Sequence, residues 1–150
     1  MKTTLLTILV CALAVIPASA TWNTQTAQQL TSEARELRTM ASDVAAQLKS
    51  KQADVAAVEA RLDQFTQRAG EINRLVDEMA QSGLTLDARQ QREFDRLKTL
   101  ATLLNVFVDN KKQLIESGNA ASQRELLRAH AVGVAARADL IEKTVRKIGN

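Results

Sequence analysis

The stretch "LKSKQADV" (residues 48–55) decides the fold of this chain, because a long helical pattern either continues through it or turns back there. No Gly, Pro or Asn lies between Leu48 and Val55, and Lys, Gln and Ala are good helix formers. The apolar heptad that precedes the stretch keeps its phase beyond it, whereas a heptad restarting after a turn would match by chance about one time in seven. The stretch therefore predicts a helix that continues through Lys51.

That heptad extends over residues 23–80 and is the strongest pattern in the sequence. Its a and d positions, called here the first-helix seam, are apolar everywhere except Lys51: Ala27, Leu30, Ala34, Leu37, Ala41, Val44, Leu48, Lys51, Val55, Val58, Leu62, Phe65, Ala69, Ile72, Val76 and Met79. This spacing is typical of a coiled coil. Alanine at every a position before residue 48 permits close approach of another helix, which either the same chain or a second copy could supply.

Two further helices follow the breakers "QSG" (81–83) and "SGN" (117–119), in which Gly83 and Gly118 are placed to be left-handed C-terminal caps. The second helix, about 86–116, begins after a cap at Thr85 or Asp87. Its apolar positions form two neighbouring stripes: Phe94, Leu97, Ala101, Leu104, Val108 and Ile115, interrupted by Lys111, and Leu100, Phe107 and Leu114. The third, about 120–148, carries a capping box at Ser122 and Glu125 and an unbroken seam: Leu127, Ala131, Val134, Ala138, Ile141, Val145 and Ile148.

Short connections make consecutive helices antiparallel neighbours. The sequence thus predicts an all-α fold: a long N-terminal coiled-coil helix (about 23–80), with an antiparallel C-terminal helical hairpin (about 86–116 and 120–148) packed on its second half. Residues 23–50 would then project as a free arm; the alternative is a turn at Ser50 that closes a four-helix bundle. The net charges, −2 for residues 21–80 and +4 for residues 81–150, favour docking of the hairpin on the long helix.

Residues 1–20 have the features of a signal peptide that is cleaved from the mature chain. Lys2 is their only charge, Leu5 to Ile16 is apolar, and Ala18-Ser19-Ala20 is a small-x-small cleavage pattern. About 12 apolar residues are too few to cross a bilayer, so no stable membrane insertion is expected after cleavage. Cys11 would be lost, leaving residues 21–150 as a single helical domain without disulfides. We expect a secreted protein, located in a bacterial periplasm.

No residue pattern in the mature chain predicts a catalytic, cofactor-binding or metal site. His130 is the only histidine, and its place beside the third seam suggests a half-buried residue at the edge of a bundle. Removing Lys2 leaves a net charge of +2, which does not favour nucleic acid as a partner. Trp22 is expected to cap one end of the bundle, or otherwise to anchor a partner. We expect no enzyme activity and no cofactor.

The segment "LTLDARQQREFDRL" (84–97) resembles the Leu-Thr-x-x-Gln segments of small periplasmic helical chaperones related to the envelope-stress family. It differs from them because Ala88 stands at the glutamine position and no second copy follows, so we interpret it as a helix start.

The sequence therefore predicts a non-enzymatic exported protein that acts by protein-protein interaction, as a structural adaptor or by self-association. The first-helix seam would contact a protein partner or a second copy. The alternatives are a periplasmic chaperone-like stress protein and an accessory protein of an envelope secretion or conjugation system.

Overall fold

The computed structural model describes residues 22–50, 55–110 and 120–149, and these form four helices. Their bounds are α1 (Thr24–Gln47), α2 (Val55–Gln81), α3 (Ala88–Asp109) and α5 (Ala120–Gly149). The all-α prediction is confirmed for this part of the chain. The proposed signal peptide at 1–20 and the second-helix residues 111–116 lie outside it, as do Lys51, Lys111, Leu114, Ile115 and Gly118.

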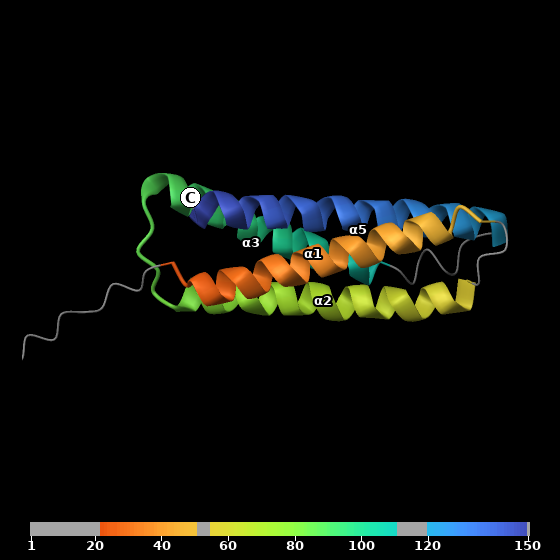
Figure 1. The fold of residues 1–150 in the computed structure, drawn as a ribbon, viewed down its shortest axis with the longest axis horizontal. Helices are drawn as coiled ribbons and strands as arrows, with labels where there is room; N and C mark the ends of the chain where they lie inside the picture. The colour runs from red at the N-terminus through yellow and green to blue at the C-terminus, as the bar shows by residue number, and fades with distance from the viewer. Residues whose placement is uncertain (1–21, 51–54, 111–119, 150) are drawn as a thin grey trace, which may run out of the picture.

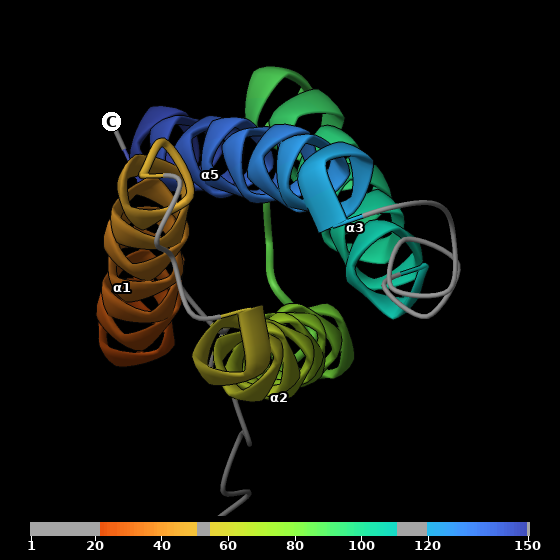
Figure 2. The same ribbon diagram turned by 90° about the vertical axis from the view of Figure 1, so that its right-hand side faces the viewer.

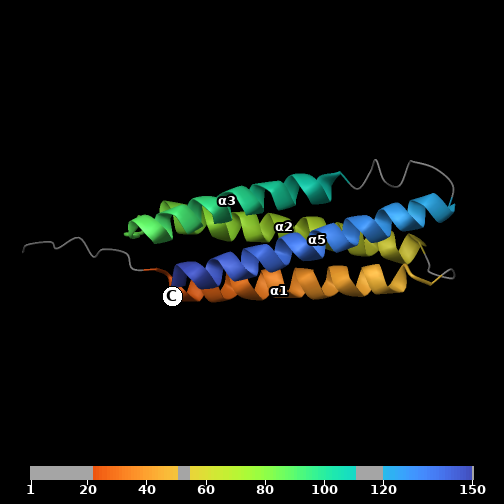
Figure 3. The same cartoon turned by 90° about the horizontal axis from the view of Figure 1, so that it is seen from above.

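The four helices form an elongated antiparallel bundle (Figure 1). Seen end-on, they lie in a ring in the order α1, α2, α3, α5, so each helix has two neighbours (Figure 2). The most extensive contact joins α1 to α5, the first and last helices of the chain. Figure 3 shows that the start of α1 and the end of α5 share one end of the bundle.

The prediction of one continuous helix through residues 48–55 is wrong. Helix α1 ends at Gln47, and the N–H groups of Lys49 and Ser50 donate to carbonyls three residues back, which tightens the last turn. Helix α2 then runs back along α1, where Arg68 lies 2.6 Å from Glu33. In one straight helix over residues 23–80, those two residues would be about 50 Å apart. The ion pair therefore excludes a straight helix through this segment.

Burial of the first-helix seam explains why α2 folds back along α1. In a free arm, Leu30, Leu37 and Val44 would face water, whereas in the bundle each is fully buried. Burial of three such side chains contributes roughly 5–9 kcal/mol. Interrupting a helix made of good formers costs only tenths of a kcal/mol per residue in lost propensity.

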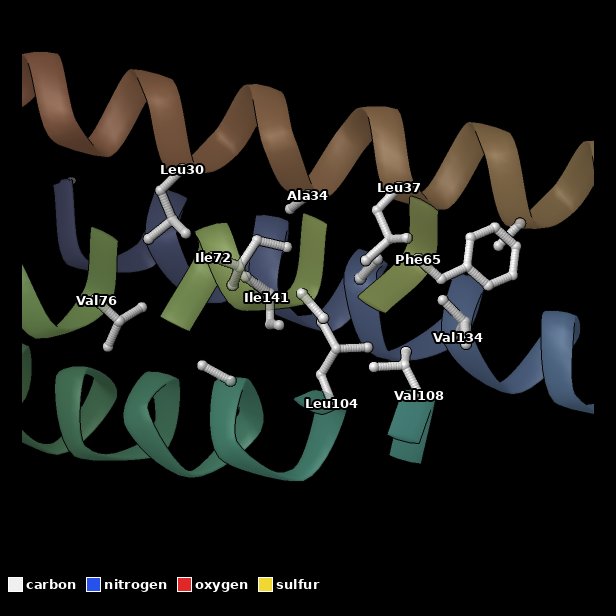
Figure 4. Packing of buried hydrophobic residues seen from close by; sticks show 14 of the residues in the cluster. Leu30, Ala34, Leu37, Phe65, Ile72, Val76, Leu104, Val108, Val134 and Ile141 are labelled. Carbon is white, nitrogen blue, oxygen red and sulfur yellow. The ribbon is translucent and has the colours of Figure 1, made fainter. Parts of the chain in front are cut away.

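The core is made of the positions that the heptads predicted. Every seam residue whose side chain is described is buried, from Ala27 to Met79 on α1 and α2, from Phe94 to Val108 on α3, and from Leu127 to Ile148 on α5. Figure 4 shows side chains of all four helices meeting along the bundle axis. Leu100 and Phe107, the second stripe of α3, are partly buried against this core.

The helix ends agree with the sequence in two places and differ in one. Asp87 is the N-cap of α3 and forms a capping box with Gln90, which confirms the helix-start interpretation of residues 84–97. Gly83 has a φ of 68°, the left-handed conformation predicted for it. Helix α5, however, begins at Ala120, so Ser122 lies inside the first turn and the predicted capping box does not start the helix.

Candidate interaction surface

Ion pairs around one buried carboxylate join α1 to α5. The Glu142 side chain, 5% exposed, accepts hydrogen bonds from Arg35 at 3.1 Å and from Arg146 one turn along α5. Arg38 lies 3.4 Å from its other oxygen and 2.9 Å from Asp139. Because the carboxylate is buried while the arginines reach it from the surface, this cluster fixes the register of α1 against α5.

A shallow groove of about 290 Å³ follows the outer side of the same helix pair, nearer the 48–50 turn. We call it the α1–α5 groove. Alanines from both helices form its floor and Val132, 51% exposed, forms one wall. Its main lining residues are Ala45, Ala46, Lys49, Arg128, Val132 and Ala135. A floor of small side chains lets another helix approach closely, so the groove has the shape and polarity of a helix-docking site.

The end of the α1–α5 groove near the turn is basic. Lys49 and Arg128 also line an adjoining hollow of about 330 Å³, together with Arg124 and Glu125. Glu125 pairs with Arg128 at 2.6 Å, and Arg124 donates to the Ser50 carbonyl at 3.5 Å. Three cations therefore face one carboxylate, which gives this end an excess of positive charge and favours an acidic partner.

The exposed apolar side chains are concentrated on the C-terminal half of the chain. In the described residues, all the large exposed apolar side chains lie on α3 and α5: Leu103, Val106, Leu126, Val132 and Leu140. Helix α5 also carries six basic and three acidic side chains, whereas α2 carries three basic and five acidic ones. In the described residues, α5 therefore carries both large exposed apolar side chains and an excess of positive charge, whereas α2 carries neither.

His130 is more deeply buried than the sequence suggested. Its side chain faces α3, where the ring stacks on Phe107 with centroids 4.7 Å apart. Arg137 lies over the same Phe107 ring, 3.8 Å from its centroid. Burial, and then the nearby Arg137 charge, lower the pKa of His130 to about 4. A neutral, buried imidazole packed between two helices has a structural role here rather than that of a solvent-accessible acid or base.

Gly133 makes room for the Phe107 ring. A Cβ at position 133 would lie 2.6 Å from Phe107 Cζ and 2.9 Å from Cε1. Phe107 thus packs between His130 and Arg137 over the bare backbone of α5. The sequence placed Gly133 beside the third seam but showed no sign of this close packing, because the contact depends on the register of α3 against α5.

The first-helix seam, where the sequence led us to expect a partner, is occupied by the chain itself. Ala27, Ala34 and Ala41 are at most 7% exposed, because α2 and α5 cover them. The α1–α5 groove lies beside the seam, at the outer edge of the contact between α1 and α5, and was not recognised in the sequence. Its only sequence signal is an off-seam pair of alanines, Ala45 and Ala46, and alanine is too common in this chain to be informative.

Within the described ranges, no group of three or more His, Cys, Asp or Glu side chains could hold a metal ion. None of the described helices combines the length and apolar character needed to span a bilayer. Comparisons of the chain with known proteins give no match to any family model, any curated protein or any solved structure.

Proposed function

We propose that this chain is an exported, non-enzymatic helical protein that acts by protein-protein interaction, with the α1–α5 groove as its docking site. The observation that carries this proposal is the combination of an alanine floor, an exposed Val132 wall and a basic end in one hollow. The partner that fits is an amphipathic helix with a small apolar face and acidic residues at the end that lies near Lys49 and Arg128. The proposed location, a bacterial periplasm, rests on the signal-peptide pattern of residues 1–20.

A peptide-binding experiment tests the groove directly. Two labelled helical peptides share one Ala/Leu face and differ only in their flanks, which are Glu in one and Lys in the other. Fluorescence anisotropy is expected to show saturable binding of the Glu-flanked peptide and none of the Lys-flanked one. Ala46→Arg fills the groove floor with a charged side chain and should weaken binding at least tenfold.

Val106→Arg is the matched control, because it introduces the same side chain at an exposed position on α3, outside the groove. Equal loss of binding in both variants, or equal binding of both peptides, would contradict docking in this groove. Sedimentation equilibrium of the unlabelled chain separates an adaptor from self-association, since only the latter gives a mass that rises with concentration.

The exposed apolar residues of α3 and α5 favour a second candidate, a chaperone-like protein that shelters unfolded clients. This function predicts suppression of client aggregation at substoichiometric ratios. Replacing Leu103 and Leu140 together by Gln should reduce it, while Ala46→Arg should not. Stoichiometric peptide binding without suppression of aggregation would favour the adaptor.

A further inference from the structure

Helix α1 begins and helix α5 ends at the other end of the bundle (Figure 1). A second hollow lies between the two helices there. Its volume is about 470 Å³, within the range of pockets that bind small molecules. Seven of its lining side chains are polar, charged or aromatic: Trp22, Thr24, Gln28, Thr31, Ser32, Arg35 and Arg146. We call this hollow the Trp22 groove. It shares no residue with the α1–α5 groove, so a ligand bound here is independent of the proposed docking function.

The Trp22 groove is positively charged. Arg35 and Arg146 line it, and no acidic side chain does so among the described residues. Both guanidinium groups donate to the same oxygen of buried Glu142, which holds them in place from below. This one carboxylate faces three cations, because Arg38 lies 3.4 Å from its other oxygen, so the groove keeps an excess of positive charge. Such a lining favours an anionic ligand, and a carboxylate offers the planar pair of oxygens that guanidinium groups bind.

The geometry leaves guanidinium hydrogens for a ligand. Arg35 uses Nε and Nη2 on Glu142, and Arg146 uses Nη2. Their Nη1 groups have no acceptor in the described part of the chain. Guanidinium N–H donors that are not used within the chain are available for charge-assisted hydrogen bonds to a carboxylate.

An aromatic face and short polar side chains complete the lining. Trp22 is partly buried against the core, and its indole lies close to Gly149 near the end of α5. The Thr31 hydroxyl donates to the Ala27 carbonyl, which leaves its oxygen able to accept from a ligand hydroxyl. An indole beside hydroxyl and amide groups suits a sugar ring, which has an apolar face and hydroxyls at its edge.

We propose that the Trp22 groove binds an acidic sugar, with the ring against Trp22 and the carboxylate on Arg35 and Arg146. The groove volume of about 470 Å³ leaves room for a short oligosaccharide of such units. This is a binding site, and no covalent step is involved.

The single tryptophan of the chain provides the assay, because its fluorescence reports on this groove alone. Purified residues 21–150 are titrated with trigalacturonate, with the neutral trisaccharide maltotriose and with acetate. We expect a saturable fluorescence change with trigalacturonate only, and its loss at high salt, since the site lies at the surface. Arg146→Gln is expected to weaken binding about tenfold, because it removes the charge-assisted hydrogen bonds that Arg146 donates to the ligand carboxylate.

Arg74→Gln is the matched control, because Arg74 is also an exposed arginine that pairs with a glutamate one turn away, but it lies on α2 and lines neither groove. Gln28→Ala is a second variant that leaves the Glu142 ion pairs intact and should weaken binding in the same titration. Thermal unfolding of each variant shows whether the fold is kept. No saturable response to trigalacturonate, an equal response to maltotriose, or equal weakening by Arg74→Gln would each overturn the proposal.

Discussion

His130 makes the stability of the bundle depend on pH in a range where few other groups titrate. In the folded chain its pKa is lowered to about 4 by burial and by the Arg137 charge, whereas an exposed histidine has a pKa of 6.5. Between these two values the unfolded chain binds a proton that the folded chain does not. Stability is therefore complete above about pH 6.5 and is lost as the pH falls towards 4.

The size of the effect follows from the two pKa values. Linkage gives a loss of about 2 kcal/mol between pH 7.5 and pH 5, rising to about 3 kcal/mol at pH 4. Several carboxylates, among them Asp87, Glu125 and Asp139, have lowered pKa values because arginines, lysines or backbone N–H groups bind them. Protonation of these carboxylates also destabilises the fold as the pH falls, but at a lower pH. The range from pH 7.5 to pH 5 therefore isolates the effect of His130.

Urea unfolding followed by circular dichroism, at pH 7.5, 6 and 5, measures this effect. His130→Phe removes the titrating group and keeps a flat ring against Phe107, so its free energy of unfolding should change little over this range. The comparison uses pH dependence and not absolute stability, because the new ring also changes the packing. Wild-type and variant curves that fall in parallel from pH 7.5 to pH 5 would refute the reasoning.

Three further results are expected. Gly133→Ala should lower the free energy of unfolding by about 1–3 kcal/mol because its Cβ overlaps the Phe107 ring, and Phe107→Leu in the same chain should recover part of the loss in thermal unfolding. Glu142→Ala should lower the free energy of unfolding in urea by roughly 1–3 kcal/mol, because it leaves the arginines of the cluster without their buried partner. Glu78→Ala removes an exposed ion pair within α2 and should lower it by less than about 0.5 kcal/mol. Equal losses in the two variants would show that the Glu142 cluster does not stabilise the contact between α1 and α5. Small-angle scattering of residues 21–150 should give a longest dimension well below the roughly 87 Å of a 58-residue helix, and a value above it would favour the rod.

Much of the fold was predictable because amphipathic helices record their buried face in the sequence. The heptads identified most of the buried apolar residues of the four helices, including the alanines of the α1 seam, and Asp87 and Gly83 marked two helix ends correctly. These features depend on interactions within a few turns of one helix, so a single sequence contains them. The absence of recognised catalytic patterns led to a function based on binding, which stays a proposal.

The candidate surfaces were not predictable, because each combines side chains that are far apart in the sequence. Glu142 meets Arg35 across more than a hundred residues, and Val132 meets the alanines of α1 across nearly ninety. Trp22 and Arg146 come from opposite ends of the chain. Such pairs arise only when α5 is placed beside α1, and no local pattern encodes that placement.

The sequence by itself determined that the chain is helical, which faces are apolar and where most helices begin and end. Only the tertiary structure decided the direction of the chain at "LKSKQADV", because a heptad specifies which side of a helix is buried but not what buries it. Because the same chain supplies the apolar stripes of α2, α3 and α5, folding α2 back along α1 removes the α1 seam from water. That gain exceeds the small cost of breaking the helix, so α1 folds back and buries its seam, while its outward side stays exposed.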